Sequence, residues 1–120
     1  MSLSTKELGA FGEQLAAEYL VDQGFVILAR NWRSNSGELD IVALTEHTLV
    51  FCEVKTRRST SRGFPAEAVT PAKLTHLRAA ALNWLCEHKV SHHSMRFDVI
   101  AILATDLTSP KIHHIVDIGQ

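Results

Sequence analysis

The sequence has little that would tie it to a membrane or to the cell exterior. It contains only two cysteines, Cys52 and Cys86, which we expect to be buried thiols of a cytoplasmic protein rather than a disulfide. The longest apolar runs, such as residues 100–104, are far too short to cross a bilayer. The first residues also lack the apolar segment of a secretory signal.

An excess of charge of either sign is also absent. The chain has 12 Lys and Arg against 13 Asp and Glu, a formal net charge of -1. This balance excludes a strongly basic DNA-coating protein, so any contact with nucleic acid must be local. A length of 120 residues with 46% hydrophobic residues is typical of one globular domain, residues 1–120, with a sizeable core. No repeat or linker interrupts it.

The order of the expected elements predicts an α/β fold. A capping box at residues 4–7 begins a helix that Gly24 ends, and Thr70 with Pro71 begins a second helix that ends near residues 88–89. Apolar and β-branched runs predict strands over residues 25–30, 40–44, 48–54, 97–103 and 112–118, with a polar turn over residues 31–37. The first strand is apolar on both faces and should be well covered. We expect a mixed sheet of about five strands with flanking helices, and a parallel crossover through the second helix.

The two strands that flank Glu46 and His47 should form an antiparallel hairpin. A loop with an even number of residues pairs Leu44 with Leu49 and, further along the ladder, Asp40 with Glu53. Continued by two residues, the same ladder places Glu38 opposite Lys55. An odd loop would send the acids to opposite faces, and we favour the even loop.

Two carboxylates opposed beside apolar side chains repel each other, and a divalent cation with oxygen ligands, such as Mg²⁺ or Mn²⁺, removes the conflict. Lys55 projects on the same face as Glu53 and could orient or deprotonate a water, or offset charge on a phosphate. The simpler alternative is a surface Glu-Lys pair of no consequence. The position of Asp40 on the preceding strand, opposite Glu53 in the expected register, favours a metal site over a simple surface pair.

These residues also resemble a known signature. Gly-Glu-Leu-Asp at residues 37–40, followed by Phe-Cys-Glu-Val-Lys-Thr-Arg at residues 51–57, resembles the motif of the PD-(D/E)xK nuclease superfamily. Most closely it resembles the YraN family of small bacterial endonuclease-like proteins, similar to archaeal Holliday-junction resolvases. Leu39 replaces the proline usual before the motif Asp, as is characteristic of that family.

The resemblance implies a restriction-endonuclease-like core and a metal-dependent endonuclease that leaves a 5′-phosphate. It implies Asp40 and Glu53 as metal ligands, and it adds Glu13 of the first helix to the metal site. From the sequence pattern alone, Glu13 could equally be a solvated glutamate at the border of the apolar stripe. Glu38 could support Lys55 as part of the catalytic set, or simply cap its strand.

Basic residues follow the motif directly. Arg57, Arg58 and Arg62 lie in a Ser/Thr-rich segment without periodicity, and Lys73 lies in the first turn of the second helix. Arginines beside a metal site are suited to bind phosphate, and a cation gains nothing from the dipole at a helix start. We assign these four residues to nucleic-acid binding, with ordinary exposed side chains as the alternative.

The leading hypothesis is therefore metal-dependent hydrolysis of DNA phosphodiesters, on branched or flap DNA in repair or recombination. A non-catalytic nucleic-acid-binding module on a nuclease fold is the alternative. The pattern leaves RNA as substrate and a homodimer open.

Asp98, which also matches the family pattern, we interpret as structural and bonded to a basic side chain. The His92-His93 and His113-His114 pairs lack the spacing of a zinc site.

Overall fold

Capping residues set the bounds of both helices in the structure, a computed structural model that describes residues 3–59 and 69–119. Helix α1 (Thr5–Asp22) begins with the predicted capping box, and Gly24 follows its end with a φ of 94°. Helix α2 (Pro71–Glu87) begins with Thr70, whose side chain accepts from the backbone N–H of Lys73. Both predicted helices are confirmed. Within the described residues, neither helix is long and apolar enough to cross a membrane.

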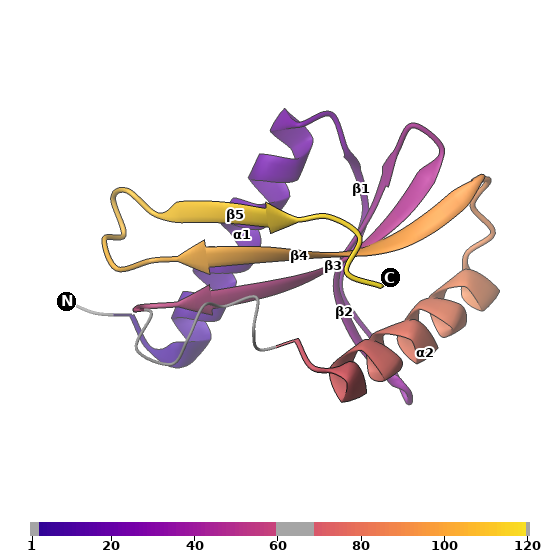
Figure 1. The fold of residues 1–120 in the computed structure, drawn as a ribbon, viewed down its shortest axis with the longest axis horizontal. Helices are drawn as coiled ribbons and strands as arrows, with labels where there is room; N and C mark the ends of the chain where they lie inside the picture. Colours follow the sequence, from indigo (N-terminus) through magenta and orange to yellow (C-terminus); the bar gives the residue numbers. More distant parts are fainter. Residues whose placement is uncertain (1–2, 60–68, 120) are drawn as a thin grey trace.

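The strands form one five-stranded mixed sheet in which they lie in chain order (Figure 1). Only β3 and β4 pair in parallel, because α2 carries the chain back between them, and the other neighbours are antiparallel. The α/β fold with a mixed sheet is therefore confirmed. The strands are β1 (Val26–Ser34), β2 (Gly37–Thr45), β3 (Thr48–Arg57), β4 (Ser94–Leu103) and β5 (Lys111–Ile115).

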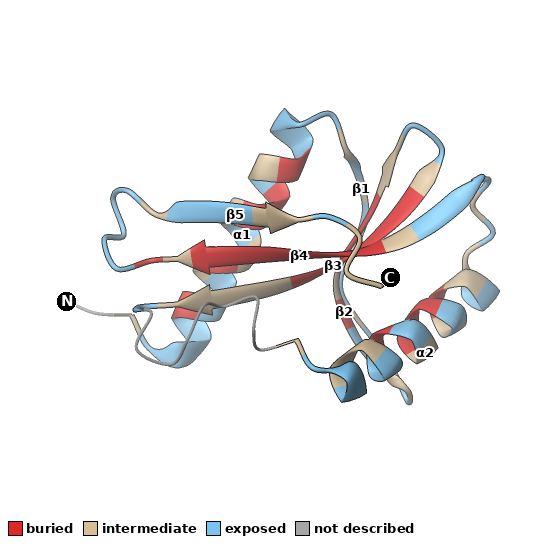
Figure 2. Cartoon of the chain, in the orientation of Figure 1, coloured by how far each residue is buried: buried red, intermediate tan, exposed pale blue. Residues whose placement is uncertain are grey.

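Each face of the sheet is covered by one helix, which gives two core clusters. Small residues of α1, including Ala16 and Ala17, pack on Ile41, Val50 and Ile100. On the opposite face, α2 packs its buried residues against the large side chains of β2, β3 and β4, namely Leu77, Ala80, Ala81 and Trp84 against Val42, Phe51 and Phe97. Figure 2 shows buried residues concentrated in the middle strands. Strand β4 lies between β3 and β5, and its residues 97–102 are buried.

The predicted cover of the first strand is wrong. Strand β1 lies at the edge of the sheet, where the side chain of Val26 is 58% exposed and that of Leu28 is 36% exposed. It also continues to Ser34, so that only residues 35 and 36 form the turn into β2. Apolar residues on both faces therefore do not guarantee a central strand. Strand β5 ends at Ile115, earlier than predicted.

The two cysteines also differ from each other. Cys52 lies in the core of the sheet, as predicted, whereas Cys86 is exposed on α2. Both are free thiols. Burial raises the pKa of the Cys52 thiol far above its ordinary value, so this thiol is inert.

The register of the β2–β3 hairpin is the one that an even loop predicts. Glu46 and His47 both have positive φ, 46° and 69°, as a two-residue hairpin turn requires. Leu44 pairs with Leu49, and Val42 pairs with Phe51. This register determines which side chains reach the end of the hairpin.

Candidate active site

The candidate site lies where β2 and β3 stop pairing and separate. Their ladder ends at the pair of Ile41 and Cys52, and Figure 1 shows the two strands diverging, β2 toward α2 and β3 toward the start of α1. Asp40 bridges the fork, because its Oδ2 accepts from the backbone N–H of Val54 at 2.8 Å. The predicted ladder pairs of Asp40 with Glu53 and of Glu38 with Lys55 therefore do not form, although the side chains of Asp40 and Glu53 still meet through a hydrogen bond.

A local irregularity in β1 and β2 accompanies this fork. The register places Asn31 opposite Asp40, and Asn31 has a left-handed φ of 51°. Leu39 packs in the α2 cluster but Ile41 packs in the α1 cluster, although residues two apart share a face in a regular strand. The alternation of faces is thus interrupted at Asp40, whose side chain turns toward β3.

The Glu53 carboxyl is buried next to Asp40. Glu53, on β3, is only 5% exposed to solvent. Burial, the charge of Asp40 and a hydrogen bond with the Asp40 side chain together raise the pKa of Glu53 to about 7. The two acids are therefore brought together, and near neutral pH one of them holds a proton for much of the time.

Two lysines face the same carboxyl group from different elements. The Nζ of Lys55, on β3, is 3.8 Å from Glu53 Oε1, and the Nζ of Lys73, on α2, is 3.5 Å from Oε2. Their charges lower the pKa of Glu53, but by less than burial and Asp40 raise it. Lys73, assigned from the sequence to nucleic-acid binding, thus lies at the carboxylate pair itself.

Glu13 reaches the edge of this site because α1 lies very close to β3. A Cβ on Gly12 would overlap the Thr56 hydroxyl, so only glycine permits the approach. The Asn31 amide, with its nitrogen turned toward Glu13, donates to both carboxylate oxygens at 2.6 and 2.9 Å. Burial and the charge of Asp40 raise the pKa of Glu13.

Glu13 nevertheless lies beside the pair of Asp40 and Glu53 rather than within it. Across residues 3–59 and 69–119, no group of three or more His, Cys, Asp or Glu side chains is arranged to hold a metal ion. Asp40 and Glu53 are joined by a side-chain hydrogen bond, so two carboxyl groups meet at this point. Glu13 could contribute through a bound water, as hard cations with retained waters permit.

The remaining predicted residues are more scattered. Glu38 forms a 3.3 Å ion pair with Arg33 on the neighbouring strand, not with Lys55. Arg57 lies at the end of β3, and its Nε is buried without a hydrogen-bond partner among the described residues. Arg58 donates to the carbonyl oxygen of Leu3, before α1. Arg62 lies outside the described residues.

Asp98 is structural, as predicted. It is fully buried on β4, where Arg96 donates to both of its oxygens at 3.0 and 3.2 Å and His114 lies 2.7 Å away. Burial would raise the pKa of Asp98, but the hydrogen bonds from His114, Arg96 and the Asp117 backbone outweigh it, and the pKa is lowered. Tyr19 of α1 bonds the other ring nitrogen of His114. This network ties β4, β5 and α1 together on the same face.

Three residues near the site were missed from the sequence. Asn31 was read as part of a turn, and only the tolerance of asparagine for left-handed φ hinted at its role. Lys6 and Arg33 line an open cleft of about 560 Å³ beside Lys55. No local pattern signals them, because they come from different elements.

Comparisons with known proteins agree with the resemblance in the sequence. The model of "Uncharacterised protein family UPF0102" matches residues 12–102, which include Glu13, Asp40, Glu53 and Lys55. A UPF0102 protein of Bifidobacterium longum is 49% identical over 117 residues, 95% of this chain and 94% of the relative. One of Acidothermus cellulolyticus is 49% identical over 118 residues, covering 90% and 89%, and one of Geotalea daltonii is 49% identical over 112 residues, covering 93% and 88%. The chain belongs to the UPF0102 family, which is the YraN family.

Proposed function

We propose that this protein hydrolyses DNA phosphodiesters with the help of Mg²⁺ or Mn²⁺. The observation that carries the proposal is the buried carboxyl of Glu53 held against the half-buried Asp40, with Lys55 Nζ 3.8 Å from the Glu53 carboxylate. A pair of acids held this close costs free energy in a protein that only folds. It is useful to a protein that binds a cation there.

The donor set fits such a cation. Carboxylate oxygens are the ligands that hard divalent cations prefer, and two of them leave open positions for water and phosphate oxygens. The pKa of Glu53, raised to about 7 by burial and by Asp40, means that negative charge at the pair is incompletely compensated. The chemistry that Mg²⁺ or Mn²⁺ supplies in such a site is polarisation of a phosphoryl oxygen and a lowered pKa of bound water.

The side chains around the pair have separate roles in this proposal. Asp40 and Glu53 hold the cation, and Glu13 orients a water at its edge. Lys55 positions the attacking water and takes up or releases its proton. Lys73 offsets charge on the phosphate from the α2 side, where its Nζ is within 3.5 Å of Glu53. Arg57 and Arg58 contact neighbouring phosphates.

A binding module without catalysis is the competing function. Its support is that both lysines already pair with Glu53, which offsets part of the charge of the site without a cation. Against it, paired acids facing a phosphate would repel nucleic acid unless a cation intervened. Cleavage assays decide between the two.

The first experiment incubates labelled junction, flap, single-stranded and duplex DNA, and the matching RNA, with Mg²⁺, Mn²⁺ or a chelator. We expect cleavage by the wild type that the chelator stops, and about a 10³-fold lower rate for Asp40→Asn, a loss typical of removing a group from the reaction centre. The substituted amide oxygen can still accept from the Val54 N–H, so the fold is retained. Equal cleavage by both proteins would contradict the metal role of Asp40. Binding without cleavage under every condition would favour the module.

Metal binding should also depend on pH. Because the pKa of Glu53 is raised to about 7, a proton competes with the cation below neutral pH. We expect the apparent Mn²⁺ affinity, measured by calorimetry, to rise roughly tenfold between about pH 6 and about pH 8. In Asp40→Asn the charge that helps raise the pKa is absent, so the residual dependence should move to lower pH. An affinity independent of pH in the wild type would contradict a cation at Glu53.

The same shift has a consequence for the metal-free protein. The folded pKa of Glu53 lies above its unfolded value, so its contribution to stability is present at low pH and is lost as the pH rises toward about 7. Saturating Mn²⁺ should therefore raise the melting temperature more at about pH 8 than at about pH 6. The Lys89→Ala variant, altered on an exposed residue beyond the end of α2, serves as a control with wild-type behaviour.

A further inference from the structure

Beside the carboxylate pair lies a cleft that shares Glu13, Lys55 and Arg57 with the proposed site and extends beyond it to Lys6 and Gly9. It has a volume of about 560 Å³ and opens between the first turns of α1, the end of β1, the start of β2 and the last residues of β3. Cationic side chains outnumber acidic ones around it: Lys6, Arg33, Lys55 and Arg57 against Glu13 and Glu38. Asp40 and Glu53 do not line it.

Gly9 is the second, independent feature of this cleft. It lies in the interior of α1, where glycine costs about 1 kcal/mol relative to alanine. Gly12, one turn later, is explained by its contact with Thr56, but a Cβ on Gly9 would meet no atom within 4 Å. Packing thus gives no reason for this glycine, and the space that it leaves belongs to the cleft.

Two cations of the cleft are available for a ligand. Lys6 is exposed and makes no hydrogen bond or ion pair with any residue in the described ranges. The Nε of Arg57 is buried and lacks a hydrogen-bond partner among those same residues. A buried donor without a partner carries a desolvation cost, and a shift that turns this guanidinium toward an anionic ligand in the cleft would relieve it.

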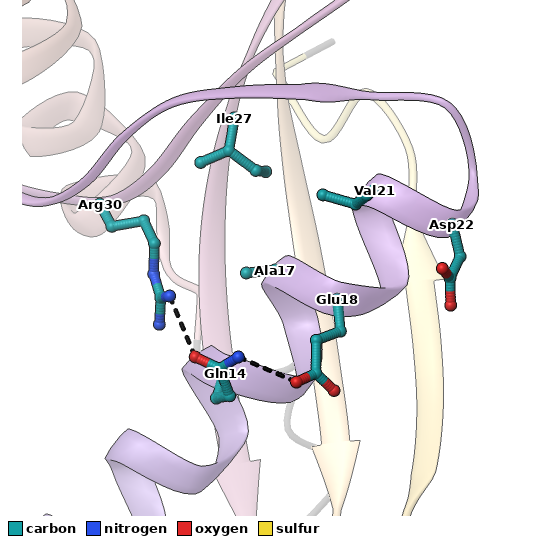
Figure 3. A pocket seen from close by; sticks show the side chains of 7 residues that line it. All are labelled: Gln14, Ala17, Glu18, Val21, Asp22, Ile27 and Arg30. Carbon is teal, nitrogen blue, oxygen red and sulfur yellow. Dashed lines mark hydrogen bonds between the residues drawn. The ribbon is translucent and has the colours of Figure 1, made fainter.

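A different hollow on the molecule offers none of this. It lies between α1 and β1 and has a volume of about 360 Å³. Three of its polar side chains bond one another, since Arg30 donates to Gln14 at 3.1 Å and Gln14 donates to Glu18 at 2.8 Å (Figure 3). The cleft at Gly9 is therefore the better candidate for an anion.

We propose that the cleft at Gly9 seats one unpaired nucleic-acid strand, directly next to the phosphate that is cleaved, with Lys6 and Arg57 bound to its backbone phosphates. The position of the cleaved phosphate rests on the proposed function, whereas the occupancy of the cleft does not. A volume of this size is that of a small-molecule pocket, so it admits a nucleotide or two but not a duplex.

The chemistry of the walls determines how the strand is read. Among the described residues that line the cleft none is aromatic, so bases find no stacking platform on these side chains. Recognition runs through phosphate and sugar, which fixes position without reading sequence. The substrate class is thus a strand with an unpaired segment beside the cut, of any sequence.

The test measures binding of a short fluorescent oligothymidylate by anisotropy, with a chelator present so that no hydrolysis competes. Gly9→Leu fills the cleft while remaining compatible with a helix, and Gly9→Ala is its matched control. We expect about tenfold weaker binding for Gly9→Leu and less than a twofold change for Gly9→Ala. Lys6→Ala should lower the slope of log affinity against log salt by about 0.7, the value of one phosphate contact on a single strand. Lys89→Ala should leave the slope unchanged.

Equal affinity of Gly9→Leu and Gly9→Ala would overturn the proposal, and so would a wild type that binds no oligothymidylate. The thermal shift with Mn²⁺, measured on the same variants, reports the carboxylate pair separately. If Gly9→Leu loses binding while the wild type cleaves nothing, the cleft is upheld and the proposed hydrolysis fails. If binding is unchanged while cleavage needs Asp40, the hydrolysis stands and the cleft proposal falls.

Discussion

Replacing Lys55 with alanine is expected to lower the rate of metal-dependent DNA cleavage by a factor of about 10³, within the range for removal of a general acid or base. Lys55 Nζ lies 3.8 Å from Glu53 Oε1, beside the place where a cation and its water would bind. Its loss removes the group that positions the water and moves its proton. The measurement is the single-turnover rate at saturating enzyme, which separates the chemical step from binding.

The structural role of Lys55 must be separated from its chemical role. Lys55→Arg keeps the charge but not the compact ammonium group or its readily shifted pKa, so we expect most of the rate to be lost and DNA affinity to be retained. Lys73→Ala, the matched loss of the other lysine at Glu53, should weaken phosphate binding more than it slows the bound reaction. A Lys55→Ala enzyme that cleaves within threefold of the wild type would exclude Lys55 from the reaction.

Patterns local in the chain were sufficient for most of the fold. Capping residues such as Ser4 and Thr70 predicted both helices, because a cap is a hydrogen bond within a few residues. The positive φ of Glu46 and His47 fits the even loop that gave the hairpin register. The exposure of β1 could not be predicted from its own residues, since its place at the edge of the sheet depends on how the other strands pair.

In the candidate site, too, the contacts within one hairpin could be predicted, whereas contacts between distant elements could not. Asp40, Glu53 and Lys55 come from one hairpin, and the register expected for that hairpin predicted that their side chains lie close together. The separation of β2 and β3 beyond Ile41 could not be predicted from regular strand geometry, because it comes with an irregular backbone that includes the left-handed Asn31 on a different strand. This is why Glu38 was assigned to Lys55, although it pairs with Arg33. The contact of Lys73 with Glu53 crosses from α2 to β3 and likewise has no local signal.

Gly12→Ala is expected to lower the free energy of unfolding by about 3 kcal/mol, the upper range for overpacking a close-packed contact. Alanine favours helix, so propensity alone predicts the opposite sign, a gain of about 1 kcal/mol. The clash decides the outcome, since a Cβ at this position would overlap the Thr56 hydroxyl and approach Thr56 Cβ to 2.9 Å. Chemical denaturation, read by circular dichroism, measures the difference.

Gly9→Ala is the matched control, because it makes the same change in the same helix where a Cβ meets nothing within 4 Å. It should stabilise the protein by up to about 1 kcal/mol. Thr56→Ala in the Gly12→Ala background removes the overlapping hydroxyl and should recover part of the loss. If both glycine variants were stabilised alike, α1 would not depend on close contact with β3. Glu13, the next residue along α1, would then owe its place beside Asp40 to some other contact.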